Sequence, residues 1–191
     1  MSAPPCVLLA GGRATRMGGG DKGLLPLGHG TILSALIDRL GPQCGPLAIN
    51  ANGDPARFAH LGLPVLPDPL PDWPGPLVGI LAGMRWAASL GAEVVVSAAA
   101  DTPAPPADLV ERLSAAGPLA IAATPDGWQP TFGLWPVALA DDLETALRAG
   151  TRKILAWTER HGATRVEWPD ADAFFNINTP DDLARAEALL A

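Results

Sequence analysis

Short runs of β type alternate with segments of helical period along most of this chain, and that alternation limits its fold more than any other feature. The β-type runs end at Gly, Pro or Asn, and most are followed by a stretch in which apolar residues recur every three or four positions. Such an order is expected when helices cross over between the parallel strands of one sheet. It predicts strands at residues 6–10, 47–50, 65–66, 94–98, 120–123, 132–135 and 164–167.

Four segments are predicted to be the covering helices. Residues 31–40 place Ile and Leu side chains on one face and stop at Gly41-Pro42, which is helix-terminating punctuation. Thr179 to Asp182 supplies an N-cap, a proline at the first helical position and acidic residues in the first turn, so a last helix runs towards Ala191. The two remaining helices are predicted at residues 77–90 and 107–115.

These elements predict the α/β class, with a Rossmann-like three-layer α/β/α sandwich around a mostly parallel sheet. The turn formers Pro125-Asp126-Gly127 separate two β-type runs without a helix between them, so a mixed sheet is possible. A length of 191 residues suits one substantial core better than two. We therefore expect a single domain spanning residues 1–191.

The composition excludes several classes of function. A formal net charge of −7 argues against long nucleic acid as a partner. No apolar run approaches the roughly 18 residues of a membrane-spanning helix, so we expect no membrane partner and a cytoplasmic protein. The cysteines, Cys6 and Cys44, have neither the spacing of a zinc site nor that of a disulfide framework.

Polar or glycine residues follow four of the predicted strands where each strand ends. Gly11 follows the first strand, Asn50 ends the second, Asp68 trails the third and Asp101 trails the fourth. Ligands of open α/β sheets bind beyond the carboxyl ends of the strands. Each residue alone is also a common turn former, but their joint position at one edge favours a ligand site there.

The loop from Gly11 to Lys22 is the strongest single signal. It holds Arg13, Arg16 and Lys22 against one acidic residue, Asp21, on an otherwise acidic chain. Glycines let backbone N–H groups approach phosphate oxygens, and the cations neutralise a polyphosphate. The loop lacks the Gly-Lys-Ser/Thr of a Walker motif, and its literal Gly-x-Gly-x-x-Gly starts too far beyond the strand to be a dinucleotide fingerprint.

The stretch from Leu9 to Lys22, Leu-Ala-Gly-Gly-Arg-Ala-Thr-Arg-Met-Gly-Gly-Gly-Asp-Lys, resembles the signature of the molybdenum cofactor guanylyltransferases, whose fold is nucleotide-diphospho-sugar transferase-like. Ala100 and Gln129 stand where that family commonly has Cys and His. The resemblance continues in order along nearly the whole chain, through Asn50-Ala51-Asn52, Asp68, Gly75-Pro76-Leu77-Val78-Gly79, Asp101-Thr102-Pro103, Pro130-Thr131-Phe132 and Phe175-Asn176-Ile177-Asn178-Thr179-Pro180.

This resemblance implies a Mg²⁺-dependent transfer of GMP from GTP to molybdenum-molybdopterin, with release of pyrophosphate and formation of molybdopterin guanine dinucleotide. It places Mg²⁺ on Asp101, a hard carboxylate ligand. It also implies that Arg16 and Lys22 stabilise the negative charge of the α-phosphoryl group and of the departing pyrophosphate. The nucleotide-binding residues that it implies are Leu9, Ala10, Gly11, Lys22, Asn50, Asp68 and Asp101.

On the acceptor side, Asn176 and Asn178 alternate along an extended segment and are expected to face the pterin, although Asn before a helix cap can be purely structural. Cofactor-insertion proteins or molybdoenzyme chaperones are candidate partners. Two rival functions stay open: transfer from CTP to the same cofactor or to another sugar or alcohol phosphate, and a catalytically silent nucleotide-binding domain. Relatives of the first kind usually carry Ala-Ala-Gly where this chain has Ala10-Gly11-Gly12.

Overall fold

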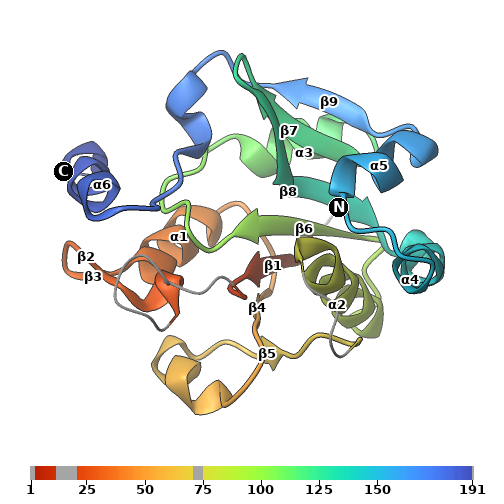
Figure 1. The fold of residues 1–191 in the computed structure, drawn as a ribbon, viewed down its shortest axis with the longest axis horizontal. Coiled ribbons are helices and arrows are strands. Elements are labelled where there is room, and N and C mark those ends of the chain that lie inside the picture. Colours follow the sequence, from red (N-terminus) through yellow and green to blue (C-terminus); the bar gives the residue numbers. More distant parts are fainter. Residues whose placement is uncertain (1–2, 12–20, 71–74, 191) are drawn as a thin grey trace.

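The computed structural model describes residues 3–11, 21–70 and 75–190, and within them the main feature is one seven-stranded sheet (Figure 1). Its strands are β1 (Cys6–Leu9), β4 (Leu47–Asn50), β5 (Val65–Leu66), β6 (Val94–Ala99), β7 (Ala120–Thr124), β8 (Gly127–Pro136) and β9 (Thr164–Glu167). They lie in the order β5-β4-β1-β6-β8-β7-β9. The chain therefore starts near the middle of the sheet and builds outwards in both directions.

The sheet is mostly parallel with one reversed strand. β1 pairs in parallel with β4 on one side and with β6 on the other, and β4 pairs in parallel with β5. β8 runs antiparallel to both β6 and β7, while β7 and β9 are parallel. The short turn between β7 and β8 cannot hold a crossover helix, so the strand after it has to reverse. The predicted α/β class and the mixed sheet are both confirmed.

Helices cover both faces, which confirms the three layers (Figure 1). Alternate side chains of β1 enter different cores: Cys6 and Leu8 pack on one face and Val7 on the other, as the period of two in a strand requires. The first face is covered by α1 (Ile32–Leu40) and α3 (Leu109–Ala116). The second is covered by α2 (Pro76–Ser89), α4 (Ala140–Arg148) and α5 (Ile154–Thr158).

Smaller elements surround these layers. A hairpin of β2 (Pro26–Leu27) and β3 (Gly30–Thr31) precedes α1, and α6 (Pro180–Leu190) packs beside it through Ala186 and the half-buried Leu183. Among the described residues no helix is long and apolar enough to cross a membrane. The remaining short helices are of the 3₁₀ type: η1 (Lys22–Leu24), η2 (Pro55–Leu61), η3 (Val137–Leu139), η4 (Glu159–His161) and η5 (Ala171–Phe174).

Every predicted strand and helix is present, with ends that mostly move by one or two residues, but some elements were not predicted. β8 begins at Gly127 instead of residue 132, because it continues directly from the turn. The hairpin β2–β3 has strands of two residues, and α5 has five, so neither is long enough to show a period. α4 does carry a helical pattern, with buried Leu143, Ala146 and Leu147, but it is not among the predicted helices.

The two edge strands of the sheet have little free hydrogen-bonding length. β5 is two residues long and stands between Pro64 and Pro67. β9 buries Val166 and exposes Arg165 and Glu167, whose charged groups are 3.3 Å apart. Both strands are therefore short, and one is charged on its outer face.

Candidate nucleotide site

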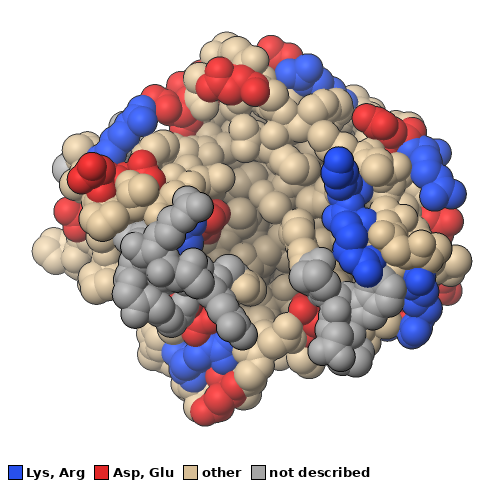
Figure 2. All heavy atoms as spheres, viewed as in Figure 1, with Lys and Arg blue, Asp and Glu red and all other residues tan. Residues whose placement is uncertain are grey.

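A cavity of about 1040 Å³ opens at the carboxyl ends of β4, β1 and β6. In the space-filling view it is a central hollow whose visible floor is mainly uncharged (Figure 2). The residues that line it come from the ends of these strands and the loops after them, from η1 and the start of α2, from β8 and from the segment before α6. They are Leu9, Ala10, Gly11, Lys22, Gly23, Asn50, Asn52, Asp68, Leu70, Gly75, Pro76, Ala99, Ala100, Asp101, Thr131 and Asn176.

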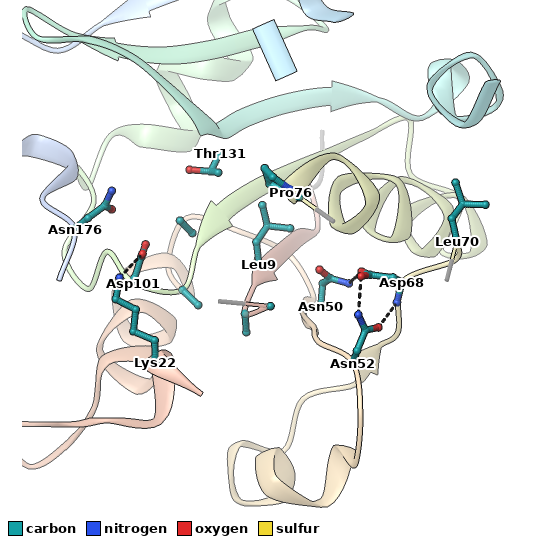
Figure 3. A pocket seen from close by; sticks show the side chains of 16 residues that line it. Leu9, Lys22, Asn50, Asn52, Asp68, Leu70, Pro76, Asp101, Thr131 and Asn176 are labelled. Carbon is teal, nitrogen blue, oxygen red and sulfur yellow. Dashed lines mark hydrogen bonds and ion pairs between the residues drawn. The ribbon is translucent and has the colours of Figure 1, made fainter. Parts of the chain in front are cut away.

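On the β6 side of the cavity an ion pair joins Lys22 to Asp101 (Figure 3). The lysine Nζ lies 2.9 Å from Asp101 Oδ2 and 2.6 Å from Asn178 Oδ1. Only 13% of the Lys22 side chain and 29% of the Asp101 side chain are exposed. A cation this well covered needs acceptors, and it finds them on two segments that are distant in the sequence.

Gly23 explains how the lysine reaches this position. A Cβ on Gly23 would lie 3.3 Å from the Leu33 Cβ and 3.4 Å from the carbonyl oxygen of Ala100. The missing side chain therefore lets η1 sit tightly between α1 and the end of β6. Lys22 starts this helix and so points across the end of the strand to the carboxylate.

On the β4 side, three polar side chains form a separate cluster (Figure 3). Asn50 donates to Asp68 Oδ1 at 2.9 Å and to the Leu66 carbonyl at 3.1 Å. Asn52 donates to Asp68 Oδ2 at 2.7 Å and accepts from the Asp68 backbone N–H at 2.9 Å. Both carboxylate oxygens of Asp68 are thus engaged by amides, which fixes the side chain and leaves Asp101 as the carboxylate suited to a cation.

The segment before α6 closes the cavity beside the ion pair. Its residues alternate, with Asn176 and Asn178 exposed and Ile177 buried, as the sequence predicts. The Ile177 N–H donates to the Asp101 carbonyl at 2.9 Å, and the Thr102 hydroxyl donates to Asn176 Oδ1. This segment is therefore attached to the loop that carries Asp101.

Asp182 holds the far end of the same segment. Its carboxylate accepts the backbone N–H groups of Asn178, at 2.9 Å, and Thr179, at 2.8 Å. The pKa of Asp182 is lowered most by the hydrogen bond from the Asn178 N–H. The Thr179 contacts and the nearby charge of Lys22 add to this, because each favours the ionised carboxylate. Near neutral pH the start of α6 is thus kept in place by an ionised cap.

A divalent metal at this cavity would have to share its ligands with a substrate. Among the described residues no group of three or more His, Cys, Asp or Glu side chains could hold a metal. Mg²⁺ commonly uses one or two carboxylates, several waters and substrate phosphates. Asp101 borders the cavity, and Lys22 contacts its Oδ2 atom. One hard oxygen ligand beside a cavity of this size fits a metal that arrives with a triphosphate.

The structure brings together nearly all residues that the sequence singled out. Asn178 reaches the cavity through Lys22, and Arg16 lies outside the described residues. What each residue does there stays a prediction. The predicted residues that line the cavity directly are Leu9, Ala10, Gly11, Lys22, Asn50, Asp68, Asp101 and Asn176.

Asn52 and Thr131 were not predicted to belong to the site. Asn52 stands two residues beyond Asn50, and this second amide after the same strand end is a signal that could have identified it. Thr131 lies within β8, the reversed strand, so the rule that sites follow the ends of parallel strands does not reach it. Its carbonyl accepts the buried Ser97 hydroxyl at 2.7 Å, which in turn accepts the Trp135 indole N–H at 2.8 Å.

A cavity at the carboxyl edge of a mostly parallel sheet, with a lysine and a carboxylate on one side and amides on the other, is the site expected of an α/β nucleotidyltransferase. Comparison with known proteins agrees. The model of the family described as MobA-like NTP transferase domain matches residues 6–164. The molybdenum cofactor guanylyltransferase of Cereibacter sphaeroides (strain ATCC 17029 / ATH 2.4.9) is 53% identical over 186 residues, covering 96% of this chain and 95% of that relative.

Two further relatives extend the comparison. The molybdenum cofactor guanylyltransferase of Bradyrhizobium sp. (strain ORS 278) is 50% identical over 200 residues, covering 100% of this chain and 94% of that relative. The solved molybdopterin-guanine dinucleotide biosynthesis protein A of Archaeoglobus fulgidus superimposes with a TM-score of 0.73 at 27% identity, covering 97% of this chain and 98% of that one. The chain belongs to the molybdenum cofactor guanylyltransferases, within the MobA-like NTP transferase domain family. The resemblance inferred from the motifs is confirmed.

The fold alone is shared more widely. The 4-diphosphocytidyl-2C-methyl-D-erythritol synthase of Anaerococcus prevotii (DSM 20548) superimposes with a TM-score of 0.74 at 14% identity, covering 99% of this chain and 96% of that one. This likeness confirms the nucleotide-diphospho-sugar transferase-like architecture. It carries no information about the nucleotide or the acceptor.

Gly79 provides a first test of the amide cluster. A Cβ there would lie 2.1 Å from Asn50 Oδ1 and 2.9 Å from Leu9 Cδ2, so Gly79→Ala must displace the Asn50 side chain. We expect nucleotide affinity to fall about tenfold, the scale of one lost hydrogen bond to a charged group. Calorimetric titration with a nucleoside triphosphate and Mg²⁺ measures the change.

The matched control is Gly83→Ala, one turn further along α2. Its Cβ would meet Val7 Cγ1 at 2.4 Å, inside the apolar core. That variant should lower the melting temperature without changing the affinity of the folded protein. In an Asn50→Ala background the affinity cost of Gly79→Ala should vanish, and a cost that persists there would contradict this account.

Proposed function

We propose that this protein transfers GMP from GTP to molybdenum-molybdopterin, releasing pyrophosphate and forming molybdopterin guanine dinucleotide. The observation that carries the proposal is the single cavity that places the Lys22–Asp101 pair and the Asn50–Asp68 pair on opposite sides of the end of β1 (Figure 3). The Cereibacter and Bradyrhizobium relatives support it, because they are named for this activity and are similar to this chain over nearly its whole length.

The two polar groups suggest how a nucleotide lies in the cavity. Lys22 and Asp101 suit the triphosphate, because they offer a cation and a ligand for a phosphate-bound metal. Asn50 and Asp68 suit the ribose or base, because amides and a fixed carboxylate can exchange hydrogen bonds with neutral groups. The backbone of Leu9, Ala10 and Gly11, at the end of β1, lies between the two groups and would contact the nucleotide along its length.

In the proposed reaction a terminal phosphate oxygen of the acceptor attacks the α-phosphorus of GTP. The bond from that phosphorus to the bridging oxygen breaks, and pyrophosphate leaves without a covalent enzyme intermediate. Catalysis is then positioning and charge neutralisation. Lys22, together with Arg16, stabilises the charge on the α-phosphoryl group and on the departing pyrophosphate.

Mg²⁺ is the metal that we propose for this reaction, held by Asp101 together with the phosphates. When bound, it neutralises phosphate charge and helps to align the triphosphate. The segment before α6 holds the backbone of this ligand in place, because the Asp101 carbonyl accepts the Ile177 N–H at 2.9 Å.

We assign the acceptor to the side of the cavity formed by Asn176 and Asn178. Asn178 contacts Lys22 directly, so an acceptor phosphate bound there would lie next to the proposed reaction centre. In this proposal residues 1–191 form one nucleotidyltransferase domain acting in the cytoplasm. Cofactor-insertion proteins or molybdoenzyme chaperones would deliver the pterin or collect the product.

The rival functions make different demands on the same site. A catalytically silent nucleotide-binding domain has no need of both Lys22 and Asp101, yet the structure pairs them in the cavity. A cytidylyltransferase binds a pyrimidine, which is smaller than a purine. The cavity wall here includes Gly75, which has no side chain, next to Pro76 at the start of α2, so the backbone of Gly75 borders this part of the cavity.

Asp101→Asn should abolish turnover while sparing the fold, because it removes the anionic ligand without changing the size of the side chain. The measurement is Mg²⁺-dependent pyrophosphate release. Asp172→Asn, at a surface carboxylate paired with Arg185, is the control and should keep full activity. Near-normal turnover of Asp101→Asn would refute the metal assignment.

Lys22→Ala should lower kcat/KM by roughly a hundredfold or more, the scale on which a preorganised charge acts on a transition state. Steady-state kinetics with varied nucleotide measures the loss. Arg165→Ala removes a surface cation from the distant edge strand β9 and serves as the control. If Lys22→Ala loses less than about threefold, the lysine has no role in stabilising the transition state.

The choice of nucleotide is tested by competition. GTP, CTP and ATP are offered together with Mg²⁺ and molybdenum-molybdopterin, and the dinucleotide product is identified. We expect guanine to be preferred by about 10²-fold or more, because backbone N–H and C=O groups that match guanine are left unpaired by the reversed pattern of adenine. A dominant cytosine dinucleotide would overturn the guanylyl assignment and leave the reaction class intact.

A further inference from the structure

Arg57 joins two parts of the cavity wall although it does not line the cavity itself. It lies in η2, after β4, and its guanidinium is fixed by backbone carbonyls: one nitrogen donates to the Asn52 oxygen at 2.6 Å and another to the Asp54 oxygen. Its Cζ also lies 4.5 Å from the ring centroid of the buried Phe58. These contacts determine where the arginine points before any ligand arrives.

The same guanidinium holds the carboxylate of Asp21. Arg57 Nε donates to Asp21 Oδ2, and a terminal nitrogen lies 3.4 Å from Oδ1. This two-point contact between a guanidinium and a carboxylate fixes both distance and orientation. Both side chains are about a quarter exposed, at 27% for Arg57 and 25% for Asp21, so solvent screens the pair only in part.

Asp21 is the residue directly before Lys22 and is the N-cap of η1, the short helix that Lys22 begins. Its carbonyl accepts the Leu24 N–H at 3.0 Å. A tether on Asp21 therefore restricts the backbone from which the Lys22 side chain extends. Lys22 needs this restriction, because a long lysine side chain has substantial rotational freedom to lose on binding phosphate.

In the other direction Arg57 is connected to the amide cluster. Arg57 donates to the carbonyl of Asn52, and the Asn52 side chain makes two hydrogen bonds with Asp68, at 2.7 and 2.9 Å. Asp68 in turn accepts from Asn50 at 2.9 Å. One guanidinium thus spans the β4 side and the η1 side of the cavity. Nothing in the motifs of the sequence marks this arginine.

We infer that Arg57 is a positioning residue that acts through Asp21 to hold Lys22 in register with the Asn50–Asp68 pair. The inference rests on the proposed function, in which Lys22 binds the triphosphate. It assigns Arg57 no contact with the nucleotide. Its effect should therefore appear only when Lys22 is present to be positioned.

The test measures the affinity of the intact protein for GTP with Mg²⁺ and for inorganic tripolyphosphate with Mg²⁺, by calorimetry. Arg57→Ala should weaken both about tenfold, since misplacing a binding group by a fraction of an ångström to an ångström has effects of this order or larger. Arg57→Lys should fall in between, because an ammonium lacks the planar fork.

Arg112→Ala is the matched control. Arg112 lies in α3 and makes the same kinds of contact as Arg57. Its Cζ lies 4.3 Å from the ring centroid of Trp168, and its guanidinium donates to the Glu167 carbonyl at 2.7 Å. It also lies 3.7 Å from the Asp108 carboxylate. It does not line the nucleotide cavity. Its loss should change melting temperature as much as the loss of Arg57 and leave both affinities within about twofold, the usual range for a surface substitution.

The deciding comparison is made in a Lys22→Ala background. If Arg57 acts through Lys22, Arg57→Ala should in that background weaken the two affinities by less than about twofold, since coupled sites are not additive. The inference is overturned if Arg57→Ala costs the same factor with and without Lys22, or no more than Arg112→Ala. If Arg57→Ala fails to fold, Asp21→Asn replaces it, because that variant leaves the carbonyl and ring contacts of Arg57 in place.

Failure of the proposed function looks different. If the wild-type protein binds CTP or ATP more tightly than GTP, the guanylyl assignment fails, while the tripolyphosphate titrations, which contain no base, still decide the role of Arg57. If GTP is preferred and the loss on Arg57→Ala does not depend on Lys22, the proposed function stands and only the inference about Arg57 falls.

Discussion

The site depends on the parallel pairing of β1 with β4 on one side and β6 on the other. Because the three strands run in the same direction, their carboxyl ends meet at one edge, with β1 between the other two. The β4 side supplies the amide cluster, and the β6 side supplies Asp101. This pairing brings Asn50, Lys22 and Asp101 around one cavity.

Close packing turns this topology into a defined geometry. Two glycines of α2, Gly79 and Gly83, leave no room for a methyl group against Asn50 and Val7, so the helix lies almost on the sheet. Gly23 does the same for η1 against the end of β6. Interiors packed at this density shift little when a ligand arrives. The polar groups of the cavity are therefore held by the closely packed elements beneath them as well as by their own hydrogen bonds.

Electrostatics explains why a covered lysine is tolerated in a cavity wall. Taking an ammonium out of water costs several kcal/mol unless acceptors replace the lost hydration. Lys22 has two, a carboxylate and an amide oxygen. The ion pair therefore keeps the lysine stretched across the end of β6, and the hydrogen bond from the same ammonium to Asn178 joins the segment before α6 to the loop of Asp101.

The sequence predicted the parts of this structure that follow from periodicity and from strand ends. The alternation of β-type runs with helical segments and the apolar face of residues 31–40 gave the layers, and the residues at the strand ends gave Asn50, Asp68 and Asp101. The hairpin β2–β3 and α5 were too short to show a period. Asn52 stands two residues beyond Asn50 and could have been predicted from that spacing, whereas the contact of Arg57 with Asp21 joins distant segments that no local pattern records. Arg16 lies outside the described residues.

The edges of the sheet have a consequence for how copies of the protein behave towards one another. An unpaired strand is a template on which a second chain can add its own strand. Here β5 offers two residues between prolines that cannot donate, and β9 presents Arg165 and Glu167 to the outside. Strand addition at either edge would join few hydrogen bonds or bury charge. Both edges of the sheet that builds the nucleotide cavity are thus poor templates for edge-to-edge pairing with a second copy.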